Sequence, residues 1–193
     1  MRTLRVLTLI PVGVFAFLGG AALGRSRRGL SMTTRSTGPL PGVPLHSWER
    51  FVLVMATAPR RRVTPRYRLG TFGMDARRLC DVGFMTAPRK VEVGGTAGGA
   101  WVGQWREPLT TEKFLQSTPA QYVAFRRSVE RMAPKVGELV GEVVDGKVCT
   151  LSGLLGVGHM AGEEGVRGWV RDPAVRKRFK ATTDNFNRTN GIF

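Results

Sequence analysis

Residues 118–132 read Thr-Pro-Ala-Gln-Tyr-Val-Ala-Phe-Arg-Arg-Ser-Val-Glu-Arg-Met, and this stretch indicates the fold class most clearly. Thr118 can cap a helix, Pro119 suits its first turn, and Gln121 follows the cap by three residues, as in a capping box. Apolar residues then recur at helical spacing on one face, at Tyr122, Phe125, Val129 and Met132. The pattern predicts an amphipathic helix that ends at Pro134.

A second helix is predicted over residues 151–160, where Thr150 can serve as the N-cap. Gly153, Gly156 and Gly158 lie inside it, and each glycine costs a helix about 1 kcal/mol. We therefore expect this helix to pack closely against a neighbour, with His159 as a core residue. Further amphipathic helices are predicted at residues 136–143, 165–170 and 173–179, before a polar tail that ends at Phe193.

The preceding part of the chain adds two helices and a hairpin. Ser47 is a suitable N-cap for a helix that ends before Pro59, and Trp48, Phe51, Val52 and Met55 share one face of it. A short helix is predicted at residues 74–82. Residues 91–93 and 101–105 have strand character on either side of a glycine-rich turn. The predicted fold class is therefore mainly α, with a minor β-hairpin or irregular loop.

The N-terminal region begins with an apolar segment. Residues 6–24 carry no charge and lie between Arg5 and Arg25. Their length just suffices for a membrane-spanning helix, and they also have the parts of a secretory signal. We predict a signal-anchor or transmembrane segment at residues 1–28, a Pro/Gly/Ser/Thr linker at residues 29–44, and one helical domain at residues 45–193. The protein is expected to be membrane-anchored or exported.

The chain is strongly basic. It has 30 Lys and Arg against 14 Asp and Glu, a formal net charge of +16. Such a charge attracts nucleic acid, anionic lipid or acidic wall polymers without choosing among them. The densest basic run makes a candidate polyanion-binding loop, alongside the alternative that it only solvates the surface. Its arginines are Arg60, Arg61, Arg62, Arg66 and Arg68.

Metal and cofactor chemistry have little support in the sequence. The chain has two cysteines and two histidines, too few and too dispersed for a zinc cluster. We expect Cys80 and Cys149 to be buried free thiols, with one disulfide as the alternative. Residues 94–99 lack the Gly-Lys-Ser/Thr ending of a phosphate-binding loop. No metal and no cofactor are predicted.

Four segments resemble, in the same order, segments of phage-type lysozyme-like domains. Residues 69–84 resemble "G-x-Y-Q-M … A-L … G-Y", residues 101–105 the "W-T-G" loop, residues 114–121 "F-L-x-x-P-x-A-Q", and residues 151–162 "S-G-L-L-A-A-x-H-L-x-G". The resemblance covers residues 45–193. It implies a compact helical lysozyme-like fold and peptidoglycan as the substrate or ligand.

The sequence departs from this family at the catalytic position. Such enzymes place a general acid, a Glu, near the end of the first helix, about fifteen residues before the segment that resembles Gly70–Met74. Residues 54–58 contain no acid, and Gly73 stands where the family has Gln. Glu49, about two helical turns upstream, is only a weak catalytic candidate. The candidate glycan-binding residues are Tyr67, Trp101, Gln104 and Trp105.

Three functions are consistent with these patterns. The first hypothesis is a non-catalytic lysozyme-like component of a phage particle or related machine, which binds peptidoglycan or neighbouring subunits. The second is an active murein hydrolase, a glycosidase or lytic transglycosylase, that uses an unaligned acid. The third is a basic membrane-bound protein that binds nucleic acid. The partners expected are thus peptidoglycan or virion subunits, the membrane through residues 6–24, and a polyanion through the basic loop.

Overall fold

The computed structural model describes residues 37–57, 67–92 and 99–193. The predicted membrane segment and four arginines of the basic run, Arg60, Arg61, Arg62 and Arg66, lie outside these residues. The described fold is mainly helical, with a small antiparallel hairpin, which confirms the predicted class. None of the helices in the described ranges is both long and apolar enough to cross a membrane.

Seven α-helices and two strand pairs make up the described fold. The helices are α1 Leu45–Ala56, α2 Ala76–Asp81, α3 Thr111–Gln116, α4 Thr118–Val136, α5 Leu151–Arg171, α6 Pro173–Arg178 and α7 Lys180–Thr189, with a 3-10 turn at Gly137–Leu139. The strands form two antiparallel pairs, β1 Met85–Val91 with β2 Ala100–Trp105, and β3 Val143–Val144 with β4 Lys147–Val148.

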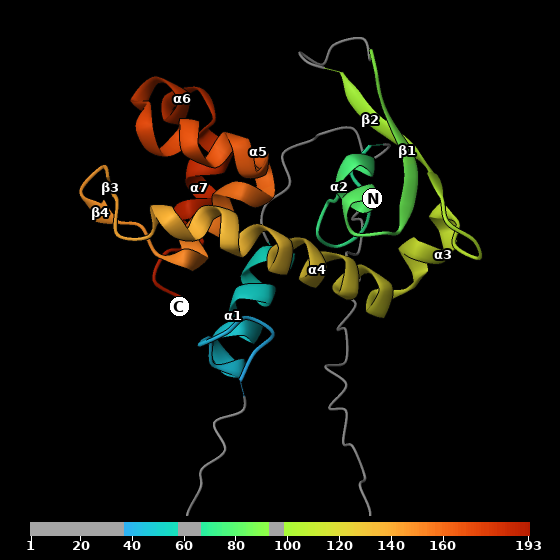
Figure 1. Cartoon of the computed structure of the whole chain (residues 1–193), viewed down its shortest axis with the longest axis horizontal. Coiled ribbons are helices and arrows are strands. Elements are labelled where there is room, and N and C mark those ends of the chain that lie inside the picture. Colours follow the sequence, from blue (N-terminus) through green and yellow to red (C-terminus); the bar gives the residue numbers. More distant parts are fainter. Residues whose placement is uncertain (1–36, 58–66, 93–98) are drawn as a thin grey trace, which may run out of the picture. The chain divides into compact units, whose positions relative to one another are not determined.

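Helix α4 is the central element of the fold. Figure 1 shows α2, β1, β2 and α3 around its N-terminal part and α5, α6 and α7 around its C-terminal part. The predicted apolar face of α4 is buried at Phe125, Val129 and Met132, and half-buried at Tyr122. The face extends to Val136 and so contacts both groups of elements.

Phe125 lies at the centre of an aromatic cluster. Its ring stacks on Phe72 at a centroid distance of 4.1 Å and lies 6.1 Å from Phe51 and 6.3 Å from Trp48. His159 meets it edge-on at 5.4 Å. These residues come from α1, from α4, from α5 and from the turn that precedes α2. The cluster therefore joins segments that are distant in sequence.

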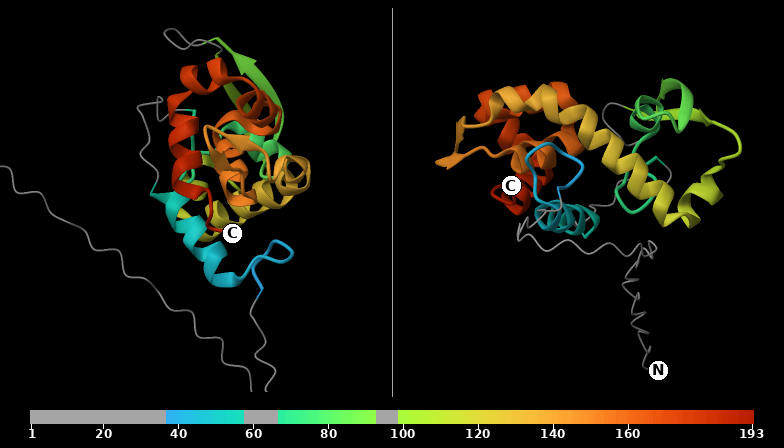
Figure 2. Two further views of the ribbon diagram at one scale, coloured as in Figure 1. Left: turned by 90° about the vertical axis from the view of Figure 1, so that its left-hand side faces the viewer. Right: turned by 60° about the horizontal axis from the view of Figure 1, so that its bottom comes forward.

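The glycines of α5 pack as predicted. A Cβ added at Gly156 would meet the Thr189 hydroxyl of α7, and one added at Gly158 would meet the Met132 sulfur of α4. A Cβ added at Gly153 would meet the side chain of Asn190 and the ring of Phe186. The absence of side chains at these positions allows α7 and α4 to approach the α5 backbone. Figure 2 shows α7 also lying beside α1, where Arg188 Nη2 donates to the carbonyl of Val54 at 3.3 Å.

Several local predictions differ from the structure at helix ends. Helix α1 begins after Pro44, so Ser47 lies buried in its first turn rather than at the cap. Ser117, not Thr118, caps α4 and accepts a hydrogen bond from the Ala120 N–H at 3.2 Å. Pro134 does not end α4, which continues to Val136. A proline in the last turn removes only one hydrogen bond, and burial of Val136 offsets that loss.

Two longer segments also differ from prediction. Residues 136–143, predicted as an amphipathic helix, form the 3-10 turn and enter the β3–β4 hairpin. The polar tail contains α7, whose buried residues are Thr182, Asn185, Phe186 and Thr189. Small polar side chains suit this helix because they face the glycines of α5. Apolar periodicity alone gives little signal for such a helix.

The described fold begins before Leu45. Residues 37–44, predicted as the end of a linker, form a turn closed by a hydrogen bond from the Gly38 N–H to the Val43 carbonyl at 2.7 Å. Leu40 and Val43 of this turn are buried in the core. Cys149 is a buried free thiol, as expected, whereas Cys80 is free but only half-buried. Burial raises the pKa of both thiols.

Candidate functional site

Two of the hollows on the described surface contain residues from the segments that carry the family resemblance. The first, which we call the α1 groove, has a volume of about 320 Å³ and runs between α1, the turn at residues 69–74 and the start of α4. Its lining residues are Trp48, Glu49, Val52, Leu53, Ala56, Thr71, Phe72, Thr118, Gln121 and Tyr122. The groove is thus mostly apolar, with polar groups at its rim.

The turn at residues 69–74 forms one wall of the α1 groove. Leu69 and Met74 exchange two backbone hydrogen bonds, of 2.8 and 2.9 Å. Gly70 has a φ of +69° and Gly73 a φ of +59°, values that favour glycine. Gly73 therefore has a conformational role here. The turn buries Phe72 and leaves Thr71 exposed at the rim.

Gln121 fixes this turn to the start of α4. Its Oε1 accepts a hydrogen bond from the Thr71 N–H at 2.6 Å, and its Nε2 donates to the carbonyls of Phe114 and Leu115 at 3.0 and 2.8 Å. A Cβ at Gly70 would lie 2.7 Å from Oε1. Two segments of the resemblance, residues 69–84 and 114–121, therefore meet through one buried side chain. The spacing from Thr118 predicted a capping-box role for Gln121, and it gave no signal for this tertiary role.

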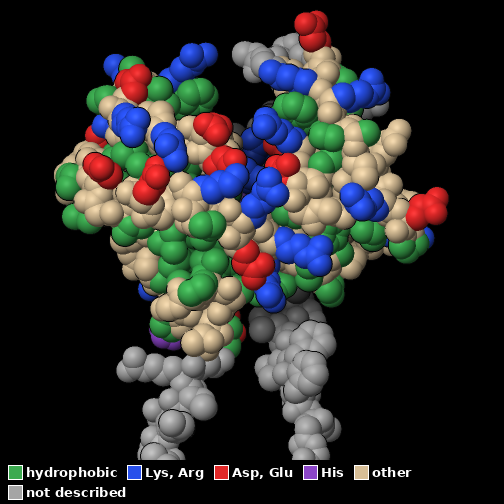
Figure 3. Space-filling view, in the orientation of Figure 1, with side chains coloured by type: hydrophobic (Ala, Val, Ile, Leu, Met, Phe, Trp, Pro, Cys, Tyr) green, Lys and Arg blue, Asp and Glu red, His purple; other side chains and the backbone are tan. Residues whose placement is uncertain are grey.

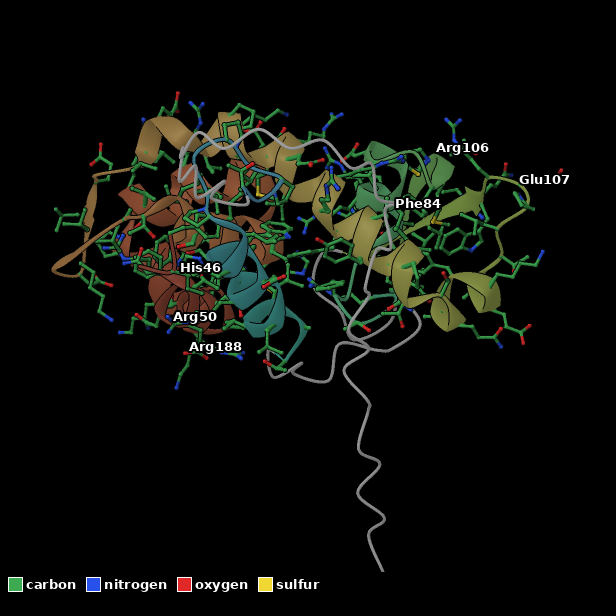
Figure 4. All side chains as sticks on the ribbon, turned by 90° about the horizontal axis from the view of Figure 1, so that it is seen from below. His46, Arg50, Phe84, Arg106, Glu107 and Arg188 are labelled. Carbon is green, nitrogen blue, oxygen red and sulfur yellow. The ribbon has the colours of Figure 1, made fainter. Side chains whose placement is uncertain are left out.

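Glu49 is the only Asp or Glu that lines the α1 groove within the described ranges, and its side chain is exposed. At the end of α1, Ala56 lines the groove instead of an acid. Thr57 turns away, because its hydroxyl donates to the Leu53 carbonyl at 2.9 Å and accepts from Arg188 at 3.5 Å. Figure 4 shows Arg188 with His46 and Arg50, far from Arg106 and Glu107.

The second hollow, which we call the α5 cleft, has a volume of about 270 Å³ and lies between α2, α4 and the bend of α5. It is lined by Asp75, Arg77, Arg78, Asp81, Val82, Trp101, Ser128, Arg131, Met132, Met160, Ala161, Gly162, Glu163 and Glu164. Figure 3 shows basic and acidic side chains around this hollow. Its character is therefore charged, in contrast to the α1 groove.

Arg78 forms the floor of the α5 cleft and links α2 to α5. Its Nη1 donates to the His159 carbonyl at 2.6 Å, and its Nη2 donates to the Gly158 carbonyl at 3.0 Å. Nη1 also lies 3.1 Å from His159 Nδ1, while His159 Nε2 lies 2.6 Å from the Phe72 carbonyl. Nδ1 therefore accepts and Nε2 donates, which is the arrangement of a neutral imidazole.

The electrostatic environment of Arg78 reflects its burial. Burial lowers the pKa of its guanidinium, and the nearby carboxylate of Asp75 opposes that effect. Arginine remains charged at neutral pH in proteins, so Arg78 is a fixed positive charge under the cleft. Because carbonyl oxygens take up its donors, its role is structural.

The bend of α5 shapes the opposite wall. Gly162 departs from helical geometry, with φ 73° and ψ 170°, and the two residues after it present carboxylates to the cleft. Glu163 pairs with Lys135 at 2.5 Å, whereas Glu164 is exposed. Across the cleft, the Arg77 guanidinium lies 5.0 Å from the centre of the Trp101 ring.

The predicted glycan-binding residues do not meet in one site. Trp101 lines the α5 cleft. Trp105 packs on Phe114 at 5.1 Å and donates through Nε1 to the Thr111 hydroxyl at 2.7 Å. Gln104 is exposed on β2, and Tyr67 is half-buried at the start of the turn before α2.

The predicted polyanion site lies mostly outside the described residues. Arg68, its last member, donates weakly to the Met160 sulfur at 3.8 Å. All 14 acidic residues but only 20 of the 30 basic ones lie within the described ranges. The other ten basic residues are arginines of residues 1–36 and 58–66. Most of the charge excess thus belongs to these two segments.

Within residues 37–57, 67–92 and 99–193, no group of His, Cys, Asp and Glu side chains is arranged to hold a metal ion. Comparisons with known proteins found no matching family model, no significantly similar curated protein and no significantly similar solved structure. The geometry of the α1 groove and the α5 cleft is therefore the basis for a functional assignment.

Proposed function

We propose that the chain is a lysozyme-like component of a phage particle or related machine that holds peptidoglycan glycan in the α1 groove without cleaving it. The observation that carries this proposal is the convergence of three sequence segments on the groove. Ala56 at the end of α1, Thr71 and Phe72 of the turn at residues 69–74, and Gln121 all line it. The turn and Gln121 belong to the motifs that resemble lysozyme-like domains. The long helix α4 between two groups of elements also suits such a fold.

The groove has surfaces suited to a sugar chain. Val52, Leu53, Phe72 and Tyr122 supply apolar and aromatic area, against which the apolar faces of pyranose rings can pack. Thr71 and Thr118 are exposed at the rim and offer hydroxyl groups for hydrogen bonds. Glu49 can accept a hydrogen bond from a sugar hydroxyl. This combination favours binding of a neutral glycan.

The proposed lack of cleavage rests on the position of acids. A general acid protonates the leaving oxygen from a desolvated carboxyl, and its contribution to rate is typically on the order of 10²–10⁴. Ala56 occupies the groove at the last turn of α1, and Glu49 lies about 10 Å away along the helix axis. Glu49 is also exposed to solvent.

A pull-down with purified peptidoglycan tests binding, and Leu53 supplies the variant. Leu53 is 63% exposed and lines the groove, so Leu53→Ser should leave the fold intact. Loss of its apolar contact should weaken retention about three- to tenfold. Leu115→Ser is the matched control, because Leu115 is 47% exposed on α3 and does not line the groove. Equal retention of both variants on peptidoglycan would refute the α1 groove as the binding site.

Release of soluble wall fragments tests cleavage in the same samples. We expect no release by the wild type, and a trace by Ala56→Glu, which places a carboxyl in the groove. Thr57→Glu is the control, since Thr57 contacts Arg188 rather than the groove. Clear release by the wild type that disappears in Glu49→Gln would establish the alternative, an active murein hydrolase with Glu49 as its acid.

The cellular location remains part of the proposal. Residues 6–24 support an anchored or exported protein, since their apolar run is long enough to span a bilayer. The full chain should then partition with membranes or be processed near Ala22, whereas a variant that begins at Arg35 should not. Full-length protein that stays in the soluble fraction and is not cleaved would refute this location.

A further inference from the structure

The α5 cleft has charges of opposite sign on facing elements. Arg77 and Arg131 come from α2 and α4, and Glu164 comes from α5 after its bend at Gly162. Within the described residues, none of the cleft's arginines lies within 4 Å of a carboxylate oxygen of the same cleft. These charges therefore do not neutralise one another by direct contact.

Some of the charged groups are already engaged in the structure, and others are available. Arg78 donates to two α5 carbonyls, and Glu163 pairs with Lys135. Arg77, Arg131, Asp81 and Glu164 are exposed, and the hydrogen bond of Arg131 to the Asp81 carbonyl is long, at 3.5 Å. The cleft thus offers two guanidinium groups and the carboxylates of Asp81 and Glu164 to a ligand.

We propose that the α5 cleft binds the peptide stem of peptidoglycan, with a stem carboxylate at Arg77 and Arg131 and a stem amino group at Glu164. A guanidinium binds carboxylate through charge-assisted hydrogen bonds, and a carboxylate accepts similar bonds from an ammonium group. This inference rests on the proposed function, because it assigns a second part of the same wall polymer to a second hollow of the domain.

Other ligand classes fit the cleft less well. A polyanion would meet four carboxylates, from Asp75, Asp81, Glu163 and Glu164. A neutral glycan has no charge for the guanidinium groups to bind. A peptide with free carboxylates and a free side-chain amine matches both signs. Trp101, with Arg77 over its ring, adds an apolar surface for the peptide's aliphatic groups.

Calorimetric titration of the full chain with a free stem tetrapeptide that contains a diamino acid tests the proposal. Arg131→Gln and Glu164→Gln should each weaken binding about five- to tenfold, the effect of losing one charge-assisted contact. Arg171→Gln and Glu142→Gln are matched controls, since both residues are exposed and neither lines the cleft. Equal binding by all four variants would overturn the proposal.

Modified peptides assign each charge without altering the protein. Acetylation of the side-chain amine should lower the affinity of the wild type for the peptide. The same modification should leave the affinity of Glu164→Gln unchanged. Amidation of the stem carboxylates should weaken binding to Arg131→Gln less than binding to the wild type, because only Arg77 remains to bind a carboxylate in that variant. An acetylated peptide that binds the wild type as tightly as the free peptide would refute the role of Glu164. These measurements also remain informative if a variant fails to fold.

Peptide-free glycan chains separate this inference from the proposed function. They should bind the wild type, lose affinity in Leu53→Ser and be indifferent to Arg131→Gln. Peptide binding without glycan binding would overturn the α1 groove assignment alone. Glycan binding without peptide binding would overturn the α5 cleft assignment alone. Heparin that displaces the tetrapeptide would show a general anion site and would also overturn it.

Discussion

The α1 groove and the α5 cleft are similar in size but opposite in chemistry. Apolar and hydroxyl side chains line the groove. Among the described residues, Glu49 is the one acidic residue that lines it. Three arginines and four carboxylates line the cleft. Phe72 connects the two, because its ring lines the groove while its carbonyl lies 2.6 Å from His159 Nε2 beneath the cleft. One turn of the chain therefore supports two surfaces with different side-chain chemistry.

The contrast also concerns how each surface is held. Gln121 holds the groove through three hydrogen bonds of a neutral amide. Arg78 holds the cleft through charged donors to two carbonyls of α5. Hydrogen bonds of charged groups contribute about twice as much as neutral ones. Loss of Arg78 should therefore affect the fold more than loss of Gln121.

The largest effect is expected for Arg78→Met. This variant removes the donors to the carbonyls of Gly158 and His159 and leaves them buried, which should cost about 3 kcal/mol of unfolding free energy. Urea denaturation followed by tryptophan fluorescence measures the loss. Arg77→Met is the control, because Arg77 is exposed and contacts only the Trp101 ring. Similar destabilisation by both variants would mean that Arg78 does not link α2 and α5.

A smaller effect is expected for Gln121→Ala. Removal of the amide leaves the Thr71 N–H and the Phe114 and Leu115 carbonyls without that partner, at a cost of about 2 kcal/mol. The variant should also weaken glycan binding, because the turn at residues 69–74 forms a wall of the groove. Tetrapeptide binding in the cleft should change much less.

Gln116→Ala is the matched control for Gln121. Gln116 is an exposed glutamine of α3 whose amide donates only to Glu112, at 3.2 Å. Its replacement should change neither stability nor glycan binding. If Gln121→Ala weakened peptide and glycan binding equally, the groove and the cleft would be one coupled site rather than two.

Much of the fold was predictable, because most helices carry both apolar periodicity and recognisable ends. Thr150 caps α5 and the α5 glycines pack closely, as the sequence indicated. Helix α7 escaped prediction, since its buried face is mostly Thr and Asn. Thr189 of this face packs against Gly156 of α5, a partner about thirty residues away along the chain.

The candidate sites were less predictable than the fold. Tyr67, Gln104 and Trp105 were selected with Trp101 because aromatic and amide groups suit glycans, yet only Trp101 lines either hollow. Strand pairing and the packing of Trp105 on Phe114 set these positions. The link between Thr71 and Gln121 spans fifty residues, and single-sequence patterns carry no signal for such a contact.

The smallest effect expected is a difference in salt dependence between the two surfaces. Charge–charge contacts at exposed sites weaken with ionic strength, because the Debye length falls from about 10 Å at 0.1 M salt to about 3 Å at 1 M. Tetrapeptide binding at Arg131 and Glu164 should therefore weaken a few-fold over that range. Glycan binding in the α1 groove should stay nearly constant, since apolar contacts are not screened. Calorimetry at three salt concentrations measures both.

The arginines outside the described residues provide the control for this comparison. Replacement of Arg60, Arg61 and Arg62 by Ser removes three charges, and each charge that contacts a polyanion contributes about 0.7–0.9 to the slope of log affinity against log salt. The triple variant should lower that slope for single-stranded DNA while both wall ligands bind with unchanged salt dependence. The triple variant could instead remove the salt dependence of tetrapeptide binding. In that case the basic loop rather than the α5 cleft would hold the stem, and the groove and the cleft would no longer differ in electrostatic ligand binding.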